Sequence, residues 1–132
     1  MLIQQRQPFK EGWPGMWDVS VGGSAVKGEN SQSAAEREVF EELGYKLSLE
    51  NIRPVLTVHF DAGFDDIYTV EREPDISALA LQPEEVKAVK WASEEEIMRL
   101  IDSGEFIPYH KQLISLLFFM RDRRGTFTNE ES

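Results

Sequence analysis

A predicted helix over residues 33–43 carries carboxylates on one side and an apolar stripe beside them. Ser33 with a glutamate three residues on forms a capping-box pattern, and Gly44 suits a helix C-terminus. Residues spaced i, i+3 and i+4 share an arc of about 100° on a helix, and this is the spacing of Glu38, Glu41 and Glu42. The apolar stripe consists of Ala35, Val39 and Leu43. The helix is therefore expected to pack on a sheet, with its three glutamates on one shared face.

Three neighbouring carboxylates allow two interpretations. Like charges at this spacing repel by about 0.2–0.5 kcal/mol per pair, so a counterion would stabilise them. Oxygen ligands of this kind suit Mg²⁺ or Mn²⁺, which also bind substrate phosphates. Taken alone, the cluster is more typical of a solvated acidic face.

The composition limits the ligands that this chain can attract. Its 24 Asp and Glu against 14 Lys and Arg give a net charge of −10, which argues against binding a nucleic acid polymer. A small phosphorylated ligand would need metal ions to bridge it to the protein. There is no cysteine, which excludes thiolate chemistry and is in keeping with a cytoplasmic location. The longest apolar run, residues 113–120, is too short for a membrane span of about 20 residues, so no membrane association is expected.

The order of the predicted elements indicates one mixed α/β domain over residues 1–124 with a flexible tail at 125–132. Ser93 and Glu96 form a second capping-box pattern, which opens a helix that ends near Ser103 and Gly104. A last helix over residues 109–123 is apolar on most sides, so it belongs either to the core or to a dimer interface. The predicted strands cover residues 2–6, 17–21, 52–60, 66–73 and 86–91.

The glutamates belong to a longer sequence pattern of glycine, arginine and glutamate at fixed spacing, called the frame below. From Gly23, five residues lead to Glu29 and seven more to Arg37 and Glu38; an aliphatic residue, any residue, two glutamates, any residue and a glycine follow. This spacing resembles the Nudix box, and every fixed charged or glycine position matches. Tyr45 departs from the aliphatic residue that the pattern prefers at its end.

The resemblance implies an α/β/α sandwich with a mixed sheet and a metal-dependent hydrolase. It implies that Glu38, Glu41 and Glu42 bind Mg²⁺ or Mn²⁺, with the backbone carbonyl near Gly23 as a further ligand. Glu29 and Arg37 correspond to an internal ion pair that braces the loop against the helix. The implied reaction is hydrolysis of a diphosphate linkage in a small molecule, namely a nucleoside di- or triphosphate or a related nucleoside diphosphate compound.

The general base and the substrate contacts lie partly outside the frame. Within the family the base comes from the box helix or from another loop, so Glu38 is one candidate and Glu84 or Glu85 the other. Glu84 and Glu85 could equally begin a solvated turn. Arg6 and Trp17 are the candidate substrate-binding residues, although an aromatic residue in a strand is more often part of the core.

The strand around Trp17 resembles a Nudix branch related to isopentenyl diphosphate isomerase. That isomerase needs a cysteine near the place held here by Val21 and Gly22, so isomerase activity is not expected. A nucleotide-sensing module without turnover is another alternative, against which the intact box argues. Relatives in this branch have residues before the first strand. We therefore expect either a shortened N-terminal strand region or a partner subunit on its edge, the latter favouring a homodimer.

Overall fold

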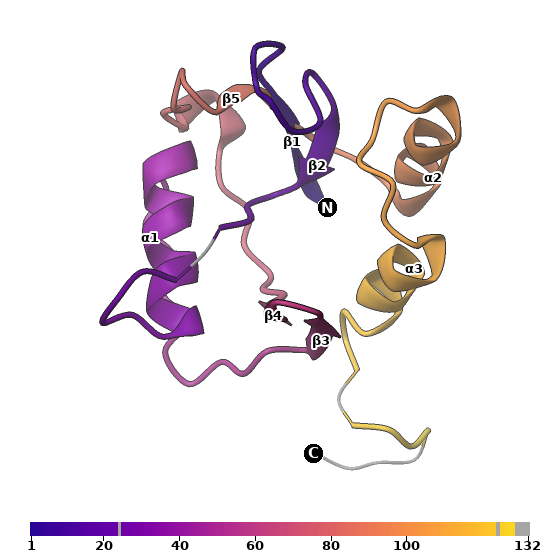
Figure 1. Ribbon diagram of the computed structural model, residues 1–132. Helices are drawn as coiled ribbons and strands as arrows, with labels where there is room; N and C mark the ends of the chain where they lie inside the picture. The colour runs from indigo at the N-terminus through magenta and orange to yellow at the C-terminus, as the bar shows by residue number, and fades with distance from the viewer. Residues whose placement is uncertain (24, 124, 129–132) are drawn as a thin grey trace.

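The computed structural model describes residues 1–23, 25–123 and 125–128, and its elements form three layers (Figure 1). Helix α1 (Ser31–Leu43) lies on one side of a sheet, and helices α2 (Glu94–Ser103) and α3 (Lys111–Phe119) lie on the other. The sheet contains β1 (Leu2–Arg6), β2 (Trp17–Val19) and β5 (Val86–Trp91); a separate hairpin contains β3 (Leu56–Phe60) and β4 (Gly63–Ile67), and a short 3₁₀ turn, η1, covers Ile76–Ala78. The expected α/β/α architecture is confirmed.

Strand β1 is the centre of the three-stranded sheet, in the order β2-β1-β5, and pairs antiparallel with both neighbours. A mixed sheet was expected; among the described residues, the parallel pairing consists of one isolated bridge between Trp17 and Phe106. Successive side chains of a strand point to opposite faces. Ile3 therefore points toward α2 and α3, where it joins the buried core of Ala92, Ile97, Phe106 and Ile114, and Gln4 points toward α1.

Helix α2 begins and ends where the sequence predicts. The Ser93 side chain accepts a hydrogen bond from the Glu96 N–H, and Gly104 ends the helix with a left-handed backbone at φ 79°. Helix α1 begins two residues earlier than predicted, because Asn30 is the N-cap and Ser33 is its capping-box partner. The Asn30 side chain accepts from the Ser33 N–H, while the Ser33 hydroxyl accepts from the Asn30 N–H. The predicted pair, Ser33 and Glu36, has the same spacing as the observed pair, Asn30 and Ser33, so the spacing of residue types alone does not distinguish the two starts.

The predicted strand over residues 17–21 ends at Val19, because the Ser20 hydroxyl turns back to donate to the Leu2 carbonyl. The predicted strands over residues 52–60 and 66–73 are also shorter or shifted. β3 starts at Leu56, and β4 begins at Gly63, within residues 61–65, which lie between the two predicted strands.

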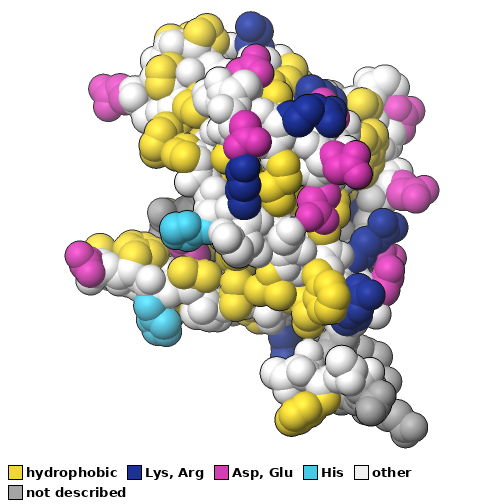
Figure 2. Space-filling view, turned by 90° about the vertical axis from the view of Figure 1, so that its right-hand side faces the viewer, with side chains coloured by type: hydrophobic (Ala, Val, Ile, Leu, Met, Phe, Trp, Pro, Cys, Tyr) yellow, Lys and Arg dark blue, Asp and Glu magenta, His cyan; other side chains and the backbone are white. Residues whose placement is uncertain are grey.

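Helix α3 spans Lys111–Phe119, shorter than the predicted 109–123, and within this chain only part of its apolar surface is buried in the core. Ile114 and Leu117 are buried, whereas Leu116 is 40% and Phe119 is 56% exposed. Figure 2, which views the molecule from the side of α2 and α3, shows apolar side chains interspersed with charged ones. Packing against a second subunit stays a prediction.

No helix among the described residues has the length and apolar character that crossing a lipid bilayer requires. The tail predicted at 125–132 is described only to residue 128, so residues 129–132 lie outside the described part of the chain.

Candidate metal centre

Helix α1 is rotated so that two of its three central glutamates face inward. Its buried residues are Ala34, Glu42 and Leu43, and the Glu38 side chain is 19% exposed. Glu41 is 47% exposed. The predicted shared face is therefore divided, because the most buried line of the helix runs through residues 34, 38 and 42 beside Leu43, while Ala35 and Val39 of the predicted stripe are only half-buried.

The C-terminal end of α1 is joined to the loop that leads into β5. The Ala80 N–H donates to the Leu43 carbonyl at 3.0 Å, and the Gln82 N–H donates to the Glu42 carbonyl at 2.9 Å. Gly44 allows this contact, since its φ is 67° and a Cβ there would lie 2.8 Å from the Ala80 Cβ. The loop carrying the predicted base candidates is thus held beside the helix that carries the glutamates.

Gly23 lies directly against the side chain of Glu38. A Cβ at Gly23 would stand 2.5 Å from both Cγ and Cδ of Glu38 and 2.8 Å from its Oε1. Such distances are well inside van der Waals contact, so the approach requires a residue without a side chain. The sequence frame placed these two residues together, and the structure gives the steric reason for the glycine.

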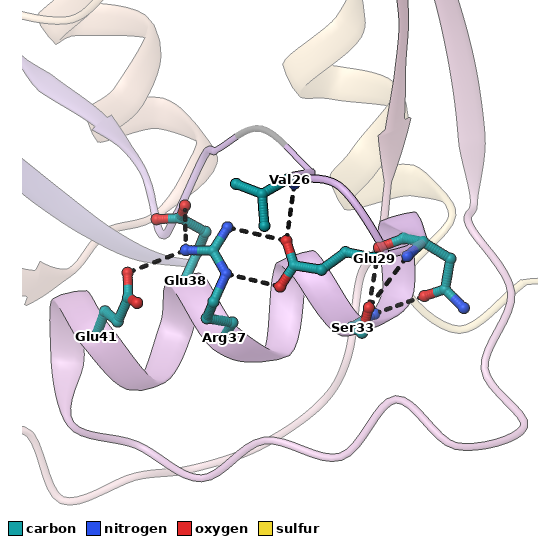
Figure 3. Close-up of polar contacts among 7 residues, drawn as sticks. Val26, Glu29, Ser33, Arg37, Glu38 and Glu41 are labelled. Atoms are coloured by element: carbon teal, nitrogen blue, oxygen red, sulfur yellow. Dashed lines mark hydrogen bonds and ion pairs between the residues drawn. The ribbon is translucent and has the colours of Figure 1, made fainter.

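The ion pair expected between Glu29 and Arg37 is present (Figure 3). Arg37 Nε donates to Glu29 Oε2 at 2.7 Å, and Nη2 donates to Oε1 at 3.1 Å. The Val26 N–H also donates to Glu29 Oε1 at 2.9 Å. This two-pronged geometry ties the loop to the first half of α1, and the hydrogen bonds from Arg37 lower the pKa of Glu29.

Arg37 also reaches the other glutamates of the helix. Its Nη1 lies 2.9 Å from Glu38 Oε1 and 3.1 Å from Glu41 Oε2 (Figure 3). The Glu29 contact, followed by smaller contributions that include Glu38, raises the pKa of Arg37 above its ordinary value. The guanidinium thus offsets part of the repulsion within the cluster.

Glu42 is the most unusual carboxylate of the cluster. It is 7% exposed, and its buried Oε2 has no hydrogen-bond partner among the described residues. Burial, followed by the negative charge of Glu38, raises its pKa to about 7, and Glu85 contributes in the same direction. A buried oxygen with lone pairs to spare, beside other carboxylates, is an arrangement that a cation would stabilise.

Glu85 belongs to the same electrostatic neighbourhood and is itself paired. Its Oε2 lies 2.6 Å from Lys10 Nζ, which comes from the loop between β1 and β2. Glu84 lines a neighbouring cavity of about 400 Å³ together with Arg6, Phe9 and Lys10. The sequence did not indicate Lys10, because the contact joins residues 75 positions apart.

The two predicted substrate-binding residues lie on opposite faces of the sheet. Arg6 is on the same face of β1 as Gln4, donates from Nε to the Gly12 carbonyl at 2.9 Å and lines the cavity. Trp17 packs against the core on the α2 and α3 side, with Lys90 Nζ 4.6 Å from the centroid of its ring. The structure therefore brings Arg6, and not Trp17, to the side of the carboxylates.

The donor set suits a hard divalent cation, although the described side chains do not yet surround one. No group of three or more Asp, Glu, His or Cys side chains among the described residues is arranged to hold a metal ion. Glu38 and Glu41 both contact Arg37, but the Glu41 side chain is exposed, whereas Glu38 is more buried and Glu42 Oε2 is a buried oxygen without a hydrogen-bond partner among the described residues. Carboxylate oxygens are the ligands that Mg²⁺ and Mn²⁺ prefer. The residues present fit such an ion chemically, with Glu38 and Glu42 as the inner pair.

Comparison with known proteins supports the resemblance of the sequence to the Nudix family. Residues 1–117 match the family model described as the NUDIX domain. An uncharacterized Nudix hydrolase of Listeria innocua is 52% identical over 109 residues, which cover 83% of this chain and 64% of the relative. The chain thus spans just under two thirds of that relative's length. Nudix hydrolase 3 of Arabidopsis thaliana is 32% identical over 123 residues, covering 83% of this chain and 16% of the relative.

Two further similarities concern the branch and the fold. The isopentenyl-diphosphate Delta-isomerase of Citrobacter koseri is 29% identical over 111 residues, covering 79% of this chain and 60% of the relative. A crystal structure of a Deinococcus radiodurans protein has a TM-score of 0.70 at 24% identity and covers 89% of this chain and 74% of that one. At this identity the second similarity concerns the fold alone.

Proposed function

The chain belongs to the Nudix family, and from that premise we propose that it catalyses hydrolysis of a diphosphate linkage with Mg²⁺ or Mn²⁺. The proposed substrate class is a nucleoside di- or triphosphate or a related nucleoside diphosphate compound. One observation carries the proposal: the buried Glu42 oxygen has no partner among the described residues and lies beside Glu38, in a loop and helix braced by Glu29 and Arg37.

Glu38 and Glu42 are the proposed inner ligands, with the backbone carbonyl near Gly23 as a further oxygen. Glu41 joins them when it leaves its contact with Arg37, which at 3.1 Å and 47% side-chain exposure is an inexpensive contact to open. A divalent ion held there supplies charge neutralisation for the phosphate oxygens and a more acidic bound water. The ion pair of Glu29 and Arg37 holds the loop in a fixed position against the helix.

Two residues are the candidates for the general base. Glu38 is held by Arg37 at 2.9 Å, and Glu85 is held by Lys10 at 2.6 Å. If Glu85 accepts the proton from the attacking water, Glu85→Gln lowers kcat by at least about 100-fold while leaving Mn²⁺ affinity near that of the wild type. If Glu38 serves as both ligand and base, Glu38→Gln lowers both quantities and Glu85→Gln lowers neither strongly.

The cavity beside Glu84 is the proposed place for part of the substrate. Arg6 lines it and would bind a phosphate oxygen or another anionic group. Trp17 is left to the core, because it lies on the other face of the sheet. Isomerase activity is not proposed, since the 132 residues contain no cysteine.

The test is product release from a panel of nucleoside di- and triphosphates and sugar nucleotides with Mg²⁺. Glu42→Gln is compared with the wild type and with Glu95→Gln, an exposed glutamate of α2 that serves as the matched control. We expect Glu42→Gln to lose at least about 100-fold in kcat and Glu95→Gln to stay within about twofold. Turnover that Glu42→Gln leaves intact would contradict the metal mechanism, and absence of turnover on the whole panel would favour a sensing module.

A further inference from the structure

Gln4 is a buried polar residue that the proposed chemistry does not use. It lies in the central strand of the sheet, opposite Asp18 of β2 and Val89 of β5, and is 5% exposed. Pairing on both sides fixes its backbone, so its side chain projects from a rigid position toward α1. A buried amide needs hydrogen-bond partners, and the partners of Gln4 connect two parts of the candidate metal centre.

The Gln4 carboxamide donates in two directions. Nε2 lies 2.6 Å from the Ser20 carbonyl oxygen and 3.5 Å from Glu42 Oε1. Both neighbours are acceptors, so only the NH₂ end of the amide suits this place, and the reversed orientation would set three oxygens against one another. The contact with Ser20 is the short one and anchors the amide, while the longer one is directed at the carboxylate.

These contacts join the loop and the helix at a defined separation. Ser20 lies three residues before Gly23, which is packed against Glu38, and Glu42 lies one turn after Glu38 on α1. A donor on Glu42 Oε1 leaves Oε2, the oxygen without a partner among the described residues, as the one available to a cation. The same amide thus restrains both the loop on one side of the cluster and the carboxylate on the other.

We propose that Gln4 is a positioning residue of the metal centre, which orients the Glu42 carboxylate and holds the Ser20–Gly23 segment at the distance that a divalent cation requires. The proposal rests on the proposed function, because it takes Glu42 as a metal ligand. Residues that hydrogen-bond to metal ligands commonly change metal affinity by about 10–100-fold when they are replaced.

A purely structural role for Gln4 predicts a different outcome. In that case the amide only satisfies the buried Ser20 carbonyl, and its replacement lowers stability without changing the affinity of the folded protein for metal. Gln5 offers a matched control, since it is the next residue of β1, points to the opposite face and donates to the Gly15 carbonyl at 3.0 Å.

The experiment measures Mn²⁺ dissociation constants by calorimetry for the wild type, Gln4→Met and Gln5→Met, each checked for folding by thermal denaturation. Methionine keeps the length of glutamine and removes its donor. We expect Gln4→Met to raise the Kd by about tenfold or more and Gln5→Met by less than about twofold. A Kd for folded Gln4→Met within twofold of the wild type, or equal changes in both variants, would overturn the proposal.

If Gln4→Met does not fold, a second variant, Gln4→Asn, tests the same proposal. This variant retains an amide, but its side chain is one methylene too short to reach both Ser20 and Glu42. We expect it to fold and to raise the Kd for Mn²⁺ at least threefold. An unchanged Kd would overturn the proposal. A failure of the proposed function can be distinguished from a failure of the Gln4 proposal. In the former case the wild type binds Mn²⁺ no better than Glu42→Gln does.

Discussion

Replacing Gly23 with alanine should displace Glu38 without unfolding the protein. The added Cβ would lie 2.5 Å from Cγ and Cδ of Glu38, whereas ordinary contact begins at 3.4 Å, so the side chain has to move by roughly 1 Å. A misplacement of this size in a reacting group costs on the order of 100-fold in rate. We therefore expect Gly23→Ala to lower kcat by about 100-fold and to weaken Mn²⁺ binding.

The loss of stability should be small by comparison. Glu38 can turn to another rotamer, and the partly exposed contact with Arg37 that it gives up contributes about 0.2–1 kcal/mol. The matched control is Gly22→Ala, because a Cβ at Gly22 meets no described atom within 4 Å. It should keep full activity and, by restricting the unfolded chain, gain up to about 1 kcal/mol of stability.

The assay is hydrolysis of the best substrate of the panel, together with urea denaturation of both variants. Equal activity of Gly23→Ala and Gly22→Ala would refute the reasoning that close approach to Glu38 is the reason for the glycine. A loss of more than about 3 kcal/mol in Gly23→Ala would refute it as well, since the defect would then be one of folding.

Two further predictions concern the ion pair and the buried carboxylate of β2. Arg37 lowers the pKa of Glu29 below its ordinary value of 4.5, so the ion pair stabilises the protein above that pH and loses its contribution as the pH falls through the lowered pKa. Glu29→Gln should flatten this acid limb of the stability curve and reduce both activity and metal affinity; if activity and affinity are both unchanged, the bracing role is wrong. The Tyr109 hydroxyl donates to the buried Asp18 Oδ1 at 2.6 Å, so Tyr109→Phe should lower the free energy of unfolding by about 1.5–3 kcal/mol in urea denaturation. A change under about 0.5 kcal/mol would mean that water replaces the hydroxyl.

Features that depend on neighbouring residues could be predicted from the sequence. The start of α2 at Ser93 and its end at Gly104 follow from hydrogen bonds within one helical turn, so the residue types are sufficient. The pairing of Glu29, in the loop before α1, with Arg37 on that helix was implied by the resemblance to the Nudix box, and it is present. The start of α1 was missed because two capping patterns overlap near Asn30 and Ser33, and only the backbone geometry distinguishes them.

The division of the glutamates could not be predicted in this way. Periodicity placed Glu38, Glu41 and Glu42 within one arc, but the rotation of α1 about its axis is set by what it packs on. That rotation buries Glu42 and leaves Glu41 at the surface. The contact of Lys10 with Glu85 and the separation of Arg6 from Trp17 likewise follow from the register of β1 with its neighbours.

The sequence by itself determined which residues form the frame, because the spacing of glycine, arginine and glutamate along one loop and one helix is a local property. Only the tertiary structure decided which carboxylate oxygen is buried without a partner among the described residues and which amide is directed at its carboxylate. Gln4 and Glu42 are 38 residues apart in the chain. Their contact exists because packing places a central strand and a helix face against each other, and no pattern of neighbouring residues encodes that distance.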